Sequence, residues 1–130
     1  MPNPVAHFEI PGDNPAELAQ FYSRLFDWKI EKMPGDWDYW FITTVATDEN
    51  GMPTEPGGIN GGLYARQAPE QKPLNYVSVP NVDQYVARAA ELGATVAMGK
   101  SPVPGMGWFA QLLDPDGNTF AVWQDDPNAA

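Results

Sequence analysis

Two short β-prone runs that each end in proline, residues 5–11 and 74–80, are the feature that most limits the fold of this chain. Proline cannot donate to a β-ladder, so Pro11 and Pro80 are natural ends for two strands. Each run leads directly into helix signals and then into further strand-like runs. The chain therefore repeats one order of elements. We expect an α+β fold of two tandem βαβββ modules.

Each expected helix starts at a recognisable cap. Asn14 is a good N-cap with Glu17 placed to complete a capping box, and Asn81 and Gln84 hold the same places in the second repeat. Behind these caps, apolar residues recur at helical spacing: Leu18, Phe21, Tyr22, Leu25 and Phe26 in the first helix, and Tyr85, Val86, Ala89 and Leu92 in the second. Such stripes must be buried, and a sheet is the surface we expect them to cover.

The expected strands of the first repeat follow its helix at residues 28–33, 39–45 and 59–65. Those of the second repeat lie at 94–103, 108–113 and 119–123. The last two flank Asp114-Pro115-Asp116-Gly117-Asn118, whose residues favour a turn, so this stretch predicts a β-hairpin.

We expect one domain over residues 1–130, divided into module one (5–65), a polar linker (66–73) and module two (74–124). With 130 residues, 43% of them hydrophobic, such a chain buries roughly two-thirds of its unfolded surface and needs no disulfide or structural metal.

Charge and composition exclude several classes of function. The net charge is −10, and the clustered Lys and Arg that neutralise phosphates are missing, so we expect no nucleic acid or membrane partner. Cysteine is absent, which excludes cysteine nucleophiles and thiolate metal sites. The chain does not start with a basic segment followed by a long apolar run. We expect a cytoplasmic protein whose partner is a small molecule.

Three stretches carry a resemblance to a known family: residues 7–11, residues 19–28 and the ending 114–124. With the repeat, they resemble the vicinal oxygen chelate superfamily of glyoxalases, bleomycin resistance proteins and extradiol dioxygenases. The resemblance implies that the two modules form a cup-shaped mixed sheet with helices on the outside. It also implies a homodimer, as superfamily members of this length often are. One scaffold of this kind hosts many reactions, so it does not identify one.

Metalloenzymes of this superfamily place His, Gln or Glu ligands on the first and last strands of their modules. By resemblance, the matching positions here are His7, Gly62, Tyr76 and Ala121. Only His7 is a usual ligand, whereas zinc sites normally need three or four. A two-histidine, one-carboxylate iron site is excluded within one chain, because the sequence has one histidine. We expect no metal cofactor, and the alternative is a divalent metal held at His7 with help from Glu9.

His7 and Glu9 share one face of the first expected strand, because side chains alternate along a strand. A carboxylate beside an imidazole is an acid/base pair, so both residues are candidate catalytic groups for proton transfer. The alternative is a hydrogen-bonded pair with a structural role.

Aromatic residues suggest a ligand cavity. Trp40, Trp108 and Trp123 are candidates to line it, with Tyr76 and His7 as polar groups that orient the ligand, and Asn60 is a further candidate. The alternative for Trp40 and Trp108 is packing under a helix.

The sequence as a whole favours a small-molecule-binding protein, similar to glyoxalases and bleomycin resistance proteins, without the usual metal set. Its ligand is expected to be aromatic or cationic. The alternative is a metal-dependent glyoxalase-like lyase or isomerase with a reduced site around His7 and Glu9. A third reading is an interaction module that binds no ligand.

Overall fold

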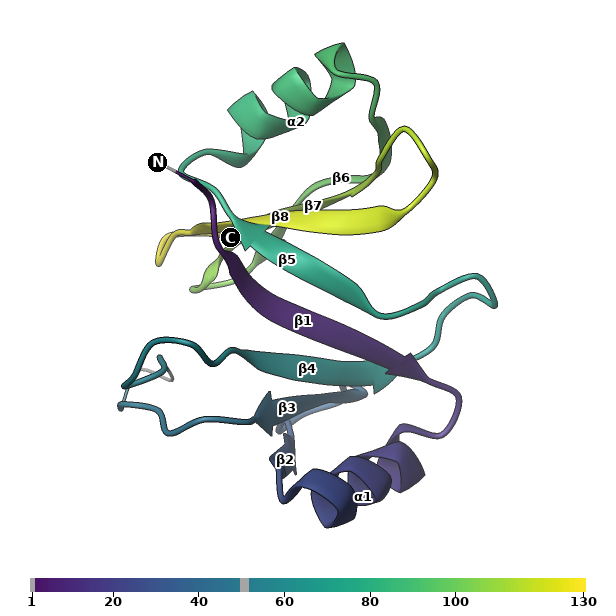
Figure 1. Cartoon of the computed structure of the whole chain (residues 1–130), viewed down its shortest axis with the longest axis vertical. Helices are drawn as coiled ribbons and strands as arrows, with labels where there is room; N and C mark the ends of the chain where they lie inside the picture. The colour runs from purple at the N-terminus through teal and green to yellow at the C-terminus, as the bar shows by residue number, and fades with distance from the viewer. Residues whose placement is uncertain (1, 50–51) are drawn as a thin grey trace. The chain divides into compact units, whose positions relative to one another are not determined.

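The computed structural model describes residues 2–49 and 52–130. Contacts divide the chain into two compact units: one is His7–Pro73, and the other combines Met1–Ala6 with Leu74–Ala130. Each unit contains the helix and the three later strands of one repeat (Figure 1). The expected order βαβββ–βαβββ and the α+β class are confirmed.

The first unit contains β1 (Val5–Gly12) from His7 onward, α1 (Pro15–Phe26), β2 (Lys29–Lys32), β3 (Tyr39–Thr43) and β4 (Asn60–Ala65). Its strand order is β2-β3-β4-β1. β1 pairs with β4 in parallel, whereas β2–β3 and β3–β4 are antiparallel, so the sheet is mixed. β1 continues one residue beyond Pro11, the end expected from the sequence, because Pro11 still lies in register with Tyr64 of β4.

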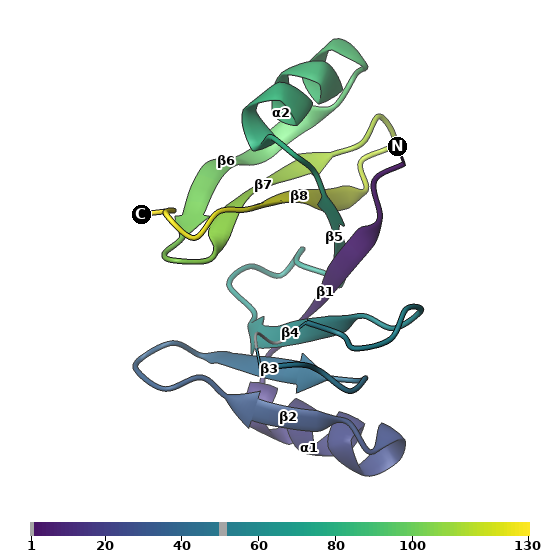
Figure 2. The same cartoon turned by 90° about the vertical axis from the view of Figure 1, so that its left-hand side faces the viewer.

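α1 lies against one face of this sheet, next to β2 and β4 (Figure 2). The expected cap is present, with Glu17 N donating to Asn14 Oδ1 at 3.3 Å. The ring of Trp28 lies between the helix and the sheet, with its centroid 5.6 Å from that of Tyr22 and 6.0 Å from that of Phe8. Side chains that share the Phe8 face therefore lie on the helix side.

The second unit contains β5 (Leu74–Ser78), α2 (Val82–Glu91), β6 (Thr95–Val103), β7 (Gly107–Leu113) and β8 (Thr119–Asp125). Its strand order is β5-β8-β7-β6, with β5 and β8 parallel and the rest antiparallel. α2 packs on β6, β7 and β8 over a core of Val79, Val82, Ala110, Leu112 and Val122.

α2 is fixed at both ends by features that the sequence predicts or explains. Gln84 N donates to Asn81 Oδ1 at 3.0 Å, which is the expected cap. Val82 N donates to Gln124 Oε1 at 2.9 Å, which ties the helix start to β8. Gly93 follows the helix with a φ of 106°, a left-handed conformation that favours glycine. None of the helices formed by the described residues is long and apolar enough to cross a membrane.

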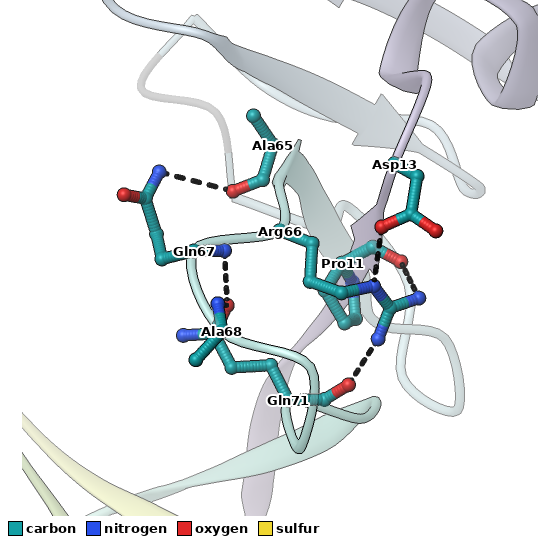
Figure 3. A network of polar contacts seen from close by, with 7 residues as sticks. All are labelled: Pro11, Asp13, Ala65, Arg66, Gln67, Ala68 and Gln71. Atoms are coloured by element: carbon teal, nitrogen blue, oxygen red, sulfur yellow. Dashed lines mark hydrogen bonds and ion pairs between the residues drawn. The ribbon is translucent and has the colours of Figure 1, made fainter.

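Arg66 holds the segment after β4 against the end of β1 (Figure 3). Its Nε donates to Asp13 Oδ1 at 2.9 Å, Nη2 donates to Pro11 O at 3.5 Å, and Nη1 donates to Gln71 O. The Arg66 side chain is 28% exposed and that of Asp13 is 86% exposed. The backbone carbonyls are therefore the partners that water competes for least.

We expect Arg66→Ala to lower the free energy of unfolding by about 1 kcal/mol, because two backbone acceptors lose a charged donor. Asp13→Ala should have a much smaller effect, since exposed ion pairs contribute little. Arg66→Lys should recover only part of the loss, because an ammonium lacks the planar fork that reaches several acceptors. Urea denaturation measures all three, and equal losses for Asp13→Ala and Arg66→Ala would contradict this assignment.

The β7–β8 hairpin has the turn that the sequence predicts. Asp114 Oδ1 accepts from the backbone N–H groups of Asp116 and Asn118, each at 2.9 Å, and Gly117 has a φ of 85°. Hydrogen bonds from Asn118 are the main cause that lowers the pKa of the Asp114 carboxyl below its usual 3.8. A group whose pKa is lower in the folded state stabilises that state above its unfolded pKa. This contribution is lost as the pH falls through the folded pKa.

We expect Asp114→Asn to lower the free energy of unfolding near neutral pH and to matter less at an acidic pH below the lowered pKa of the wild-type carboxyl, where that group is protonated. Asp116→Asn is the matched control, because it removes a charge from the same turn and leaves the Asp114 acceptor in place. Urea denaturation at the two pH values measures the difference. A loss that is the same at both would show that the charge on Asp114 does not stabilise the turn.

Candidate functional site

The sheet face of the first unit that α1 leaves uncovered carries the candidate site. In the pairing of β1 with β4, His7 lies opposite Asn60 and Glu9 lies opposite Gly62. On the other side of β4, Gly62 lies opposite Phe41 of β3. Paired residues share a face, and the face alternates with each residue. His7, Glu9 and Asn60 therefore lie on one face, as the sequence predicts for the first two.

His7, Glu9 and Tyr39 form one hydrogen-bonded group. The Tyr39 hydroxyl donates to Glu9 Oε2 at 2.8 Å and lies 3.3 Å from His7 Nε2. His7 Nε2 lies 3.2 Å from the same Glu9 oxygen. Three polar atoms from two strands thus meet within hydrogen-bonding distance of one another, and a proton can be shared among them.

The group is only partly shielded from solvent. The His7 side chain is 31% exposed and that of Glu9 is 15% exposed. Among the described residues, no buried side-chain nitrogen or oxygen lacks a hydrogen-bond partner. The group is therefore hydrogen-bonded and is still within reach of a ligand that arrives from solvent.

Gly62 makes the position of Tyr39 possible. A Cβ added to this glycine would lie 1.7 Å from the Tyr39 hydroxyl oxygen and 2.2 Å from Cζ. Any other residue at position 62 would force the phenol ring away from Glu9 and His7. The glycine therefore has a steric role in the site.

Tyr64 is the next aromatic residue on this face, opposite Tyr39 across the β3–β4 pair. Partial burial is the main cause that raises the pKa of the Tyr64 hydroxyl above its usual 10.0. The negative charge of Glu9 raises this pKa further, and Arg66 opposes the shift. The Tyr64 hydroxyl therefore stays neutral near Glu9 at ordinary pH.

The metal set of the related metalloenzymes does not fit these residues. Position 62 has no side chain, and the space for one is filled by Tyr39. Asn60, which lies opposite His7, uses Oδ1 to accept from the backbone N–H groups of Thr44 and Val45 at 2.8 and 3.3 Å. Over residues 2–49 and 52–130, no three His, Cys, Asp or Glu side chains gather as a metal site.

The two modules also differ in register by two residues. In module two, Tyr76 lies opposite Ala121, whereas in module one the matching His7 lies opposite Asn60 and not Gly62. The equivalence of Gly62 with Ala121 that the sequence suggests therefore does not extend to the first strands. Neither register supplies a second ligand.

Trp40 lies on the other face of the first unit. It pairs with Leu63, one residue out of phase with Tyr39 and Phe41, which places it on the side of Phe8 and α1. Lys32 Nζ lies 5.5 Å from its ring centroid. The structure thus does not bring Trp40 together with His7 and Glu9.

The candidate aromatic residues of the second unit are likewise divided between two faces. Tyr76 and Trp123 pack with Leu74, Ala121 and Phe109 on the face away from α2. Trp108 packs against the core under α2, and its Nε1 donates to Asp126 Oδ2 at 3.0 Å. Tyr76 and Trp123 therefore share a face. Trp108 packs under a helix, which is the alternative that the sequence analysis gave for it.

Tyr39 is the member of the site that sequence reasoning missed. The residue falls within an expected strand, but its face depends on how β3 pairs with β4. One signal was available: a glycine pair inside an otherwise apolar strand indicates close approach of another group. The sequence does not show that the approaching group is the Tyr39 phenol.

The family model described as "Glyoxalase-like domain" matches residues 8–123. Among curated proteins, the "Anthracycline biosynthesis protein DauV" of Streptomyces sp. (strain C5) is 27% identical over 136 residues, which cover 95% of this chain and 47% of that protein. The chain thus spans about half the length of the curated relatives it matches.

Solved structures share the fold at low identity. A glyoxalase/bleomycin resistance protein/dioxygenase superfamily member from Vibrio splendidus 12B01 has a TM-score of 0.62 at 14% identity, covering 95% of this chain and 100% of that one. Methylmalonyl-CoA epimerase from Mycobacterium tuberculosis has a TM-score of 0.65 at 12% identity, covering 95% and 88%.

We expect Gly62→Ala to destabilise the protein by about 1–3 kcal/mol, and by much less when Tyr39→Ala is already present, because residues in contact are strongly coupled. Gly99→Ala is the matched control, since a Cβ at this strand glycine would meet nothing within 4 Å. Urea denaturation of the four proteins of the cycle gives the coupling energy. Additive losses would show that the phenol does not occupy the space above Gly62.

Proposed function

The chain belongs to the glyoxalase-like domain family, and from this premise we propose that it is a small-molecule-binding protein that works without the metal set of the superfamily's metalloenzymes. The Tyr39 phenol over Gly62 is the observation that carries the proposal. It fills the space that a side chain at position 62, a ligand position by resemblance, would need, and it donates a hydrogen bond to Glu9 instead.

In this proposal the polar part of the site is the group His7, Glu9 and Tyr39, with Asn60 beside it on the same face. Phe41 and Tyr64 lie on the same face, and polar groups beside aromatic rings are typical of sites that orient a ligand. The partial exposure of His7 supports this role, because its ring can exchange one of its contacts for a contact with a ligand.

The second unit has a candidate binding group of its own, Tyr76 and Trp123. They lie in an apolar cluster on the face of their sheet that α2 does not cover. Large aromatic side chains of this kind bind flat, apolar ligands well. Trp40 and Trp108 are left out of these two groups, because each lies on the helix side of the sheet in its own unit.

The proposed ligand is a planar aromatic molecule, with or without a cationic group. Its aromatic character is supported by the partly exposed ring of Trp123, which packs beside the buried Tyr76, and by relatives whose names refer to anthracycline biosynthesis. A cationic group is supported by the Glu9 carboxylate and by the net charge of −10. Electrostatic attraction over the whole surface would raise the rate at which such a ligand arrives.

A second candidate function is that of a glyoxalase-like lyase or isomerase that uses a metal at a reduced site. The 3.2 Å contact between His7 Nε2 and Glu9 Oε2 favours it, because both atoms are of the ligand type and act together in acid/base chemistry. We also propose that the protein is a homodimer and is cytoplasmic, as expected from the sequence for either of the two candidate functions.

We expect an anthracycline with a protonated amine, or its amine-free aglycone, to bind the purified protein with an affinity that EDTA does not change. His7→Ala and Tyr39→Phe should each weaken binding about tenfold, the effect of one hydrogen bond to a charged or strongly polar group. Trp40→Phe, on the other face, is the matched control and should leave binding unchanged. Isothermal titration calorimetry measures each affinity.

The two arms of this experiment separate the possibilities. Stronger binding of the amine than of its aglycone would support a cationic ligand, and equal binding would support a purely aromatic one. Loss of binding in EDTA, with recovery on adding Zn²⁺, Ni²⁺ or Mn²⁺, would contradict the metal-free proposal and favour the lyase or isomerase.

A further inference from the structure

The contacts of Tyr39 carry an inference that rests on the proposed function and makes it more specific. We propose that Tyr39 is the specificity-determining residue of module one: its phenol closes a divalent-metal position that His7 and Glu9 would otherwise form with a ligand at position 62. The structure contains the two remaining ligand-type side chains in contact with each other. It also shows what stands in the third place.

A side chain at position 62 and the Tyr39 phenol would occupy the same space. Glu9 lies directly opposite Gly62 in the β1–β4 pair, and Phe41 lies opposite the same glycine in the β3–β4 pair. A side chain at position 62 would therefore leave β4 on the same face as His7 and Glu9. The Cβ of that side chain would lie 1.7 Å from the Tyr39 hydroxyl oxygen, so the two groups compete for one space.

The Tyr39 hydroxyl donates a hydrogen bond to Glu9 Oε2 at 2.8 Å, so that oxygen already accepts from one donor. The ligands that Zn²⁺ takes from proteins are thiolates, imidazoles and carboxylates. A phenol that keeps its proton is therefore a poor substitute for a carboxylate at position 62, and it occupies acceptor capacity that a cation would need.

A divalent cation is stabilised by the negative charge of its ligands, and Glu9 supplies one carboxylate. The described residues offer no third His, Cys, Asp or Glu close enough to complete such a set. Metal binding in this module therefore depends on the residues at positions 39 and 62. Tyr39 blocks the place of the missing ligand, whereas a ligand-type residue at either position would supply it.

The inference is tested by opening the space and adding the ligand. Tyr39→Ala/Gly62→Glu removes the phenol and adds a carboxylate, and Tyr39→Ala/Gly62→Ala is the matched control that removes the phenol and adds none. A second route, Tyr39→His, leaves Gly62 in place and exchanges the phenol for an imidazole. Circular dichroism shows that each variant is folded, and titration calorimetry with ZnCl₂ and NiCl₂ measures metal binding.

We expect Tyr39→Ala/Gly62→Glu or Tyr39→His to bind about one metal ion per chain at least ~100-fold more tightly than the wild type or the alanine control, the scale on which ligand shells change metal affinity. Adding His7→Ala should abolish the gain. The inference is overturned if the wild type binds as tightly as these variants. It is also overturned if both variants fold and neither gains His7-dependent binding.

The result is distinguishable from a failure of the proposed function. If the variants gain no metal but the wild type still binds its aromatic probe in EDTA, the role of Tyr39 falls and the metal-free binding function stands. If the wild type needs a metal to bind the probe, the binding proposal falls whatever the variants do.

Discussion

Parallel pairing between the first and last strands of each module is the constraint on which the rest of the structure depends. β1 pairs with β4 and β5 pairs with β8, and a parallel pair needs a crossover of a dozen residues or more. The helix and the two middle strands of each module supply that crossover. The register of the pair then decides which residues of two distant segments face the same side, and so decides that Glu9 stands opposite Gly62.

The same architecture gives different chemistry in the two modules. In the first unit, the face without a helix carries His7, Glu9 and the hydroxyl of Tyr39. In the second unit, the corresponding face carries an apolar cluster around Tyr76 and Ala121. Strand pairing and helix packing form the helix-free face in each unit, but they do not require particular side chains on it. Those residues can therefore specialise without loss of the fold.

The sequence was sufficient for the order of elements and for their caps, because these signals are local. Proline ends, Asn14 and Asn81 caps and the 114–118 turn act within a few residues of where they occur. The face of each aromatic residue was beyond local reasoning. Trp40 and Tyr39 are neighbours in one strand and lie on opposite sides of it, and only the pairing of β3 with β4 shows which side holds the site.

Gly62 illustrates how one position couples fold and function. A glycine inside a strand is less stable than a residue with a side chain by roughly 0.5–1 kcal/mol. Here the empty space lets the Tyr39 phenol reach Glu9 at 2.8 Å and pack its ring directly over β4. A side chain at position 62 would restore the strand preference but would displace the phenol and remove its hydrogen bond to Glu9. The glycine and the tyrosine are therefore one unit, and a change at either position alters the strand's stability and the chemistry of the site together.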